Sequence, residues 1–121
     1  MKGDIEFTLP VKTVNESNGS HGHWGKKAAR RASHRTAVWA KMAGKVLPAL
    51  PVVVTMTRIS AGELDAHDNL RGSLKAVADQ IADQYGIKDK DKRFDWQYAQ
   101  EKAPRGVYGV RIRIESTGSE T

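Results

Sequence analysis

The sequence predicts an α+β fold, a mixed sheet with two long helices packed on it in the order β-α-β-α-β-β. Residues 52–59 form a β-branched, apolar run that is typical of a central strand. The segments 25–47 and 69–85 repeat apolar residues at helical spacing. The segments that alternate apolar and polar side chains, as half-buried strands do, are 4–9, 94–98 and 108–114.

Local signals justify the predicted boundaries of these elements. Pro10 ends the first strand, because proline has no N–H to donate to a sheet. Pro48 follows the first helix directly. Asp68 is a suitable N-cap for the second helix, and Gly86 is a suitable stop because helices often end on a residue with positive φ. The segment 102–106 contains proline and glycine and predicts the turn between the last two strands.

Composition indicates a single domain over residues 1–121, with 116–121 as a frayed polar tail. The chain has 20 Lys and Arg against 14 Asp and Glu, a net charge of +6, and a pI near 9.7, which favours a polyanionic partner. It has no cysteine, which excludes disulfides and thiolate metal sites and fits a reducing cytoplasm. No apolar run approaches the length of a membrane span, so we expect no membrane partner.

The first predicted helix is basic throughout, with no Asp or Glu between Trp24 and Leu50. A solvated helix face normally mixes both signs to gain pairs at i and i+4, so the absence of acids favours a surface that contacts DNA phosphates. A merely solvated face is the alternative. The predicted DNA-binding residues are Lys26, Lys27, Arg30, Arg31, His34, Lys41 and Lys45.

The same helix carries an apolar stripe that we expect to face the core. Its members are Ala28, Ala32, Trp39, Ala43 and Val46. The second helix carries a stronger stripe, also predicted to be core: Leu70, Leu74, Val77, Ile81 and Tyr85.

Aspartates stand at both ends of the second helix. Asp65 and Asp68 precede it, and Asp89 and Asp91 follow Gly86. The face opposite the apolar stripe carries Asp68, Arg71, Lys75 and Asp79. One interpretation is a capped surface helix with solvated charges. The other is a divalent-metal site, since carboxylates are the ligands that Mg²⁺ prefers and phosphodiester cleavage commonly uses Mg²⁺, or Mn²⁺ in its place.

The order Asp68-Asn69-Leu70, then a helix, then aspartates after a glycine resembles the RusA family of Holliday-junction resolvases, which is common in phages and prophages. Those proteins carry D-x-D-N-L, a helix and an Asp-Asp pair. The resemblance extends over residues 4–115, because this chain also has a first strand ending in Leu-Pro and a basic helix before the acidic one. It implies a RusA-like fold, a homodimer, and Mg²⁺-dependent cleavage of branched DNA.

The resemblance places the motif acids residue by residue. Asp68 matches the second acid of D-x-D-N-L. The first acid falls at Ala66, which is a departure from the family pattern, and the adjacent Asp65 is the candidate replacement. Asp89 matches one member of the Asp-Asp pair, and Asp91 is a further candidate.

The family's basic residue falls at Gly72, and Lys75 lies one turn further along the helix. The catalytic residues implied by the resemblance are Asp65, Asp68, Lys75 and Asp89. The implied metal ligands are Asp65, Asp68, Asp89 and Asp91.

Two functions follow from this pattern. The first is a Mg²⁺-dependent, structure-selective endodeoxyribonuclease that resolves Holliday junctions or other branched DNA in the cytoplasm of a bacterial cell. The second, favoured by Ala66, is a DNA-binding protein of the same fold with weak or lost cleavage. A basic structural or protein-binding module is a third class, and it leaves the acid-free helix and the acidic cluster without a role.

The separation of the aspartates also bears on the site. An unbroken helix over 69–85 is about 25 Å long and holds Asp68 and Asp89 at opposite ends. A single-chain site then needs a broken helix or a sharp fold-back after Gly86. The alternative hypothesis is a site shared between the two subunits of a dimer.

Overall fold

The computed structural model describes residues 4–13, 24–62 and 69–117. Along the chain the elements are β1 (Ile5–Leu9), α1 (Trp24–Met42), β2 (Val52–Ser60), α2 (Asn69–Ser73), α3 (Lys75–Tyr85), β3 (Phe94–Lys102) and β4 (Gly109–Ser116). This order confirms the predicted α+β architecture. It differs from the prediction in one respect, because the second helix is divided into α2 and α3.

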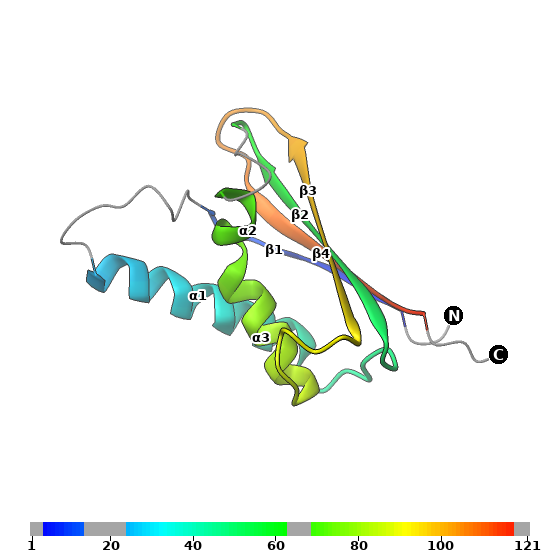
Figure 1. Cartoon of the computed structure of the whole chain (residues 1–121). Helices are drawn as coiled ribbons and strands as arrows, with labels where there is room; N and C mark the ends of the chain where they lie inside the picture. Colours follow the sequence, from blue (N-terminus) through cyan, green and yellow to red (C-terminus); the bar gives the residue numbers. More distant parts are fainter. Residues whose placement is uncertain (1–3, 14–23, 63–68, 118–121) are drawn as a thin grey trace.

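The strands form one mixed sheet in the order β1-β4-β2-β3 (Figure 1). β4 runs antiparallel to both β1 and β2, whereas β3 runs parallel to β2. Parallel neighbours require a crossover connection, and α2 and α3 supply it here. β2 therefore lies inside the sheet and is bonded on both sides, as its β-branched sequence predicts.

The helices lie on one face of the sheet, and no described helix covers the opposite face (Figure 1). The apolar stripe predicted for 69–85 faces the core: Leu70, Leu74, Val77 and Ile81 are buried and Tyr85 is half-buried. The sheet contributes Val54, Met56, Ile112 and Ile114 to the same core. No described helix is both long and apolar enough to cross a membrane.

The predicted unbroken helix over 69–85 is wrong at Leu74. This residue has φ −109° and ψ 5°, outside helical geometry, and its N–H bonds to the carbonyl of Arg71 at 3.1 Å. Gly72 and Ser73 precede it directly, and adjacent glycine and serine are a usual place for a helix to kink. The Ser73 hydroxyl donates to the Leu70 carbonyl at 2.8 Å and occupies the break.

Helix α1 faces the core with a different side from the one predicted. His34, Val38 and Met42 are buried. The predicted apolar stripe is exposed at every member: Ala28, Ala32, Trp39, Ala43 and Val46. Alanine buries little apolar area, so Val38 and Met42 contribute more on burial and decide the orientation. The helix also ends at Met42, before the positive φ of Gly44, and not at residue 47.

Candidate functional site

Lys75 begins α3 and joins two carboxylates. Its Nζ donates one hydrogen bond to Oδ1 of Asp79 at 2.9 Å and another to Oδ2 of Asp89 at 2.8 Å. Asp79 follows Lys75 by four residues, so the two side chains lie on the same face of α3. Asp89 comes from beyond the end of that helix, so its place beside Lys75 depends on a reversal of the chain.

Gly86 provides the reversal. It has φ 75°, in the left-handed region, which a residue without Cβ adopts at no steric cost. The N–H groups of Gly86 and Ile87 bond back to the last turn of α3 and close the helix. The indole Nε1 of Trp96 then donates to the backbone carbonyl of Asp89 at 2.8 Å and holds this residue in place.

The reversal has a consequence for the hypothesis of a shared site. It brings Asp89 next to Lys75, a residue fourteen positions earlier in the chain. A break in the helix and a fold-back after Gly86, the two routes to a site within one chain, are therefore both present. Asp68 lies outside the described residues, so the shared-site hypothesis stays a prediction.

The three charged groups stabilise one another in ionised form. Hydrogen bonds from its ammonium to Asp89 and Asp79 raise the pKa of Lys75, and the bond from Lys75 lowers the pKa of Asp89. The Lys75 side chain is 57% exposed, and exposed ion pairs contribute little to stability. The shifts therefore favour the charged forms of Lys75 and Asp89, close to solvent.

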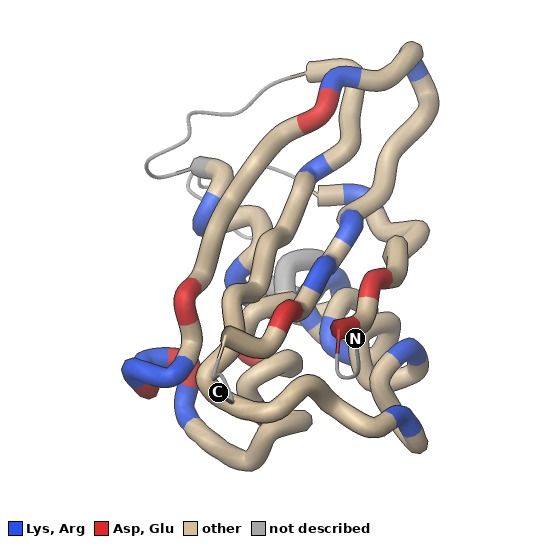
Figure 2. The backbone as a smooth tube through the Cα atoms, turned by 90° about the vertical axis from the view of Figure 1, so that its right-hand side faces the viewer, with Lys and Arg blue, Asp and Glu red and all other residues tan. Residues whose placement is uncertain are grey.

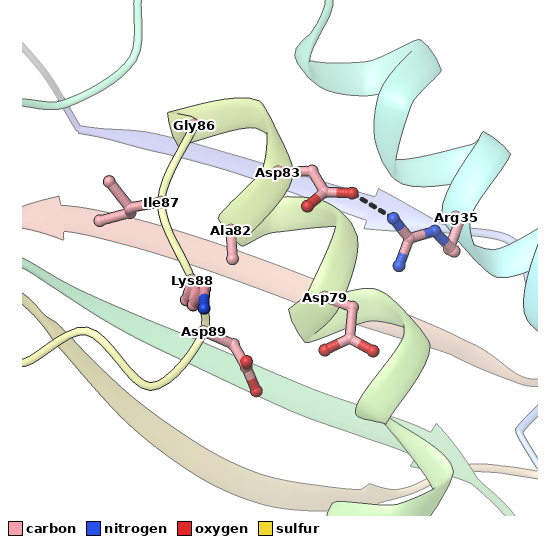
Figure 3. Close-up of a pocket in the computed structure, with 8 residues that line it drawn as sticks. All are labelled: Arg35, Asp79, Ala82, Asp83, Gly86, Ile87, Lys88 and Asp89. Carbon is pink, nitrogen blue, oxygen red and sulfur yellow. Dashed lines mark hydrogen bonds and ion pairs between the residues drawn. The ribbon is translucent and has the colours of Figure 1, made fainter.

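A pocket of about 490 Å³ opens beside the cluster, between α1, α3 and the segment after Gly86 (Figure 3). Its lining residues are Arg35, Asp79, Ala82, Asp83, Gly86, Ile87, Lys88 and Asp89. The Arg35 guanidinium reaches across from α1 and forms an ion pair with Asp83. The pocket thus combines three carboxylates with cations from two separate elements.

The structure brings together two of the predicted site residues, Lys75 and Asp89. Asp65 and Asp68 lie outside the described residues. Asp91 is not among the pocket residues, and its carboxylate accepts hydrogen bonds from Nε and Nη2 of Arg93, each at 2.9 Å. The bonds from Arg93 lower the pKa of Asp91 and engage both of its oxygens.

Four charged pocket residues were not selected from the sequence: Arg35, Asp79, Asp83 and Lys88. Asp79 had a usable signal, because it lies one turn after Lys75 on the charged face of the helix. Arg35 and Asp83 had none, since they are 48 positions apart and meet only when α1 packs beside α3.

The carboxylates of the pocket are few for a divalent-metal site. Among the described residues, no three His, Asp or Glu side chains form a group that could hold a metal ion. Asp79 and Asp89 offer two carboxylates, and Mg²⁺ is usually held by one or two carboxylates together with water and substrate phosphates. In this structure the oxygens Asp79 Oδ1 and Asp89 Oδ2 accept hydrogen bonds from Lys75.

The basic residues predicted on the first helix take different places. Arg31 and Lys41 are exposed, and neither forms an ion pair with another residue in the described part of the chain. Arg30 is half-buried. The side chains of Lys26 and Lys27 lie outside the described residues.

His34 and Lys45 differ from the prediction. His34 is only 3% exposed, and its Nε2 donates to the backbone carbonyl of Lys12 at 3.0 Å, so it belongs to the core and not to a DNA-binding surface. Lys45 lies beyond the end of α1, with its Nζ 5.9 Å from the centroid of the Phe7 ring.

The open face of the sheet carries charges of both signs (Figure 2). Arg113 forms ion pairs with Glu6 and Glu115, both at 3.1 Å, and Arg111 pairs with Glu101 at 2.8 Å. These pairs raise the pKa of both arginines. The arginines of this face are therefore already neutralised by the protein's own carboxylates.

Arg58, near the end of β2, is 6% exposed. Its Nε donates to the Thr13 hydroxyl at 2.8 Å and its Nη1 to the Gly62 carbonyl at 2.6 Å. Burial lowers the pKa of this guanidinium. Arg58 thus ties together two segments that follow β1 and β2, and the second of them leads in sequence to Asp65 and Asp68.

A scan of the sequence against models of protein families found no match, and a search of curated proteins found none either. The resemblance to the RusA resolvases is therefore a hypothesis that rests on the order of motifs and elements. The geometry of the pocket is an observation that does not depend on this resemblance.

Proposed function

We propose that this chain is a Mg²⁺-dependent, structure-selective endodeoxyribonuclease that cuts Holliday junctions or other branched DNA, as the RusA resolvases that it resembles do. One observation carries the proposal. The fold brings Asp89 and Asp79 together through their hydrogen bonds with Lys75. Both aspartates line a pocket whose opposite wall is the acid-free helix α1. Phosphodiester hydrolysis requires carboxylates to hold the metal and cations to hold the DNA, and this pocket supports both roles.

The carboxylates form the catalytic part of the proposal. Asp79 and Asp89 would hold Mg²⁺, or Mn²⁺ in its place, together with Asp65 and Asp68 of the motif. When bound, such an ion activates water and stabilises the charge that develops on the phosphate. Lys75 is placed to hold a phosphate oxygen beside these carboxylates, because its ammonium already lies between two of them.

Helix α1 forms the DNA-binding part. Arg31 and Lys41 project into solvent without an ion-pair partner among the described residues, so their charges are available to phosphates. Arg35 lines the pocket and leads from this helix to the carboxylates. A duplex arm held along α1 therefore passes close to the proposed catalytic groups.

A second function, DNA binding of the same kind with weak or lost cleavage, is supported by two specific observations. Ala66 stands where the family motif has an acid. Lys75 bridges the carboxylates that a metal ion would have to share. A site with one carboxylate fewer and a competing ammonium has a lower affinity for Mg²⁺.

The remaining parts of the proposal come from the resemblance. We propose a homodimer, which offers two sites for two symmetric cuts across a junction. We also place the protein in the cytoplasm of a bacterial cell, where DNA with four-way branches is its substrate.

Cleavage of a synthetic four-way junction tests the proposal. The parent protein is expected to cut the junction and not a linear duplex of the same sequence, in Mg²⁺ or Mn²⁺ and not in EDTA. Asp89→Asn should lower the rate by at least about a hundredfold, since loss of a ligand weakens metal binding strongly. Asp95→Asn is the matched control, because Asp95 is an exposed acid on β3 that does not line the pocket.

Three results are possible for the parent protein. Metal-dependent cutting that Asp89→Asn abolishes supports the nuclease. Binding to the junction without cutting supports the second function. Failure to bind either DNA in low salt contradicts both.

A further inference from the structure

The outer face of α1 carries an exposed tryptophan that does not pack in the core. Trp39 is 55% exposed, although its size makes it a usual core residue. Small, uncharged and exposed side chains lie near it along the chain: Thr36, Ala40 and Ala43. In Figure 1 no described segment covers the outer side of this helix.

Trp39 continues a row of arginines. Arg31 and Arg35 precede it by eight and four residues, so the three side chains follow one another along one side of the helix, about 6 Å apart at each step. Arg35 also lines the pocket that contains Asp79 and Asp89. Trp39 therefore lies one helical turn from the proposed catalytic pocket.

We propose that Trp39 is a stacking site for an unpaired nucleobase of DNA, with Arg31 contacting a phosphate of the same strand. The identity of this ligand rests on the proposed function. Aromatic side chains beside a basic row are the usual arrangement for binding single-stranded DNA, because every base has a planar face that can stack. The alanines next to Trp39 do not project beyond Cβ and leave its ring open to a base.

Charge decides between DNA and a second copy of the chain as the occupant of this face. The sequence from Trp24 to Leu50 contains no acid. Two copies packed through α1 about a two-fold axis would bring the cations of both helices together without a carboxylate on these helices to offset them. A polyanion is complementary to this face.

A stacking site for an unpaired base would also give the protein a preference for branched DNA over a linear duplex. In a linear duplex the bases are stacked on one another, and extruding one costs unstacking energy. Unpaired bases at a branch point avoid this cost. A stacking site one turn from the pocket would thus favour strands that have left the duplex, close to the carboxylates that would cut them.

Fluorescence anisotropy with a labelled oligodeoxythymidylate, in EDTA, tests this inference. Trp39→Ala is expected to weaken binding of the single strand by about tenfold, whereas binding of a blunt duplex should change by less than about twofold. The salt dependence should stay the same, because Trp39 makes no phosphate contact. Trp39→Phe should retain most of the affinity, since phenylalanine also stacks. The matched control is Val46→Ala, which removes another exposed apolar side chain and should have no effect.

Three outcomes overturn the inference. Trp39→Ala binds the single strand as the parent does, or it loses single strand and duplex equally, or it changes the oligomeric state of the protein and leaves DNA binding unchanged. The last outcome would make the face an interface between two copies of the chain.

The binding assay also separates this inference from the proposed nuclease. Binding is measured in EDTA, where the proposed nuclease is inactive, so the tenfold loss on Trp39→Ala does not depend on cleavage. If the parent cuts no junction but this loss persists, the stacking site stands and the nuclease falls. If the parent cuts junctions and Trp39→Ala binds the single strand normally, the stacking site alone falls.

Discussion

Helix α1 and the open face of the sheet both carry cationic side chains, but they differ in whether these side chains form ion pairs. On the sheet, Arg111 and Arg113 are paired with glutamates. On α1, Arg31 and Lys41 have no ion-pair partner among the described residues. We therefore assign the proposed phosphate contacts to these two cations of α1, because no carboxylate of the described residues competes with a phosphate for them.

The difference has a simple structural origin. Strand register sets each side chain directly opposite one on the neighbouring strand, and Glu6 lies opposite Arg113 in the β1–β4 pair. Within a single helix a charge can pair only with residues three or four positions away, and α1 has no acid at any position. Arg35 finds Asp83 only because α3 packs beside it.

The largest effect is expected on the inner face of α1, which holds its outer cations in position. Met42 is buried, so Met42→Ala should lower the free energy of unfolding by about 2–5 kcal/mol, through lost apolar burial and a residual cavity. Val46→Ala, at a side chain that is 86% exposed, should change it by less than about 0.5 kcal/mol. Denaturant unfolding measures both. Equal losses would show that the outer side is also packed.

Removing cations from the two surfaces tests the comparison directly. Replacing Arg31 and Lys41 with Gln should weaken duplex binding by about tenfold or more at low salt and reduce the salt slope by roughly 2, because two phosphate contacts disappear. Replacing Arg111 and Arg113 with Gln removes the same charge from the paired surface and should have little effect. Binding titrations over a range of salt measure both. The comparison fails if the two pairs of substitutions weaken binding equally.

The smallest effect concerns the paired cation in the pocket. Lys75→Met should raise the pKa of Asp89 towards its ordinary value of 3.8, because the hydrogen bond from Lys75 is the main cause that lowers it. NMR titration of the carboxyl carbons measures this shift. The pKa of Asp91, which Arg93 lowers, should not move and serves as the control. An unchanged Asp89 would mean that Lys75 does not pair with it in solution.

The same pair has a definite pH window. Asp89 has a lowered pKa in the folded state, so its contribution to stability is present above pH 3.8 and is lost as the pH falls through the folded value. Lys75 has a raised pKa, so its contribution is complete below pH 10.5 and is lost as the pH rises through the folded value. The Lys75→Met variant should lose both dependences.

Local patterns in the sequence were sufficient to predict the strands, their order along the chain and the apolar face of the second helix. Alternation, β-branching and helical periodicity depend only on neighbouring residues, and large residues such as Leu74 and Ile81 leave no choice of which face to bury. The resemblance to the RusA family, and not periodicity, selected Lys75 and Asp89 as candidate residues, whereas the sequence directly showed that the first helix carries cations without acids.

Tertiary structure decided what periodicity alone could not. The alanine stripe of α1 and its Val38–Met42 side are both compatible with a helix, and packing against the sheet and α3 buried the larger side chains and left Trp39 in solvent. The reversal at Gly86 set Asp89 beside Lys75, and the contact of two helices made the Arg35–Asp83 pair. These contacts join residues far apart in the chain, and their free energy exists only when the whole core has formed.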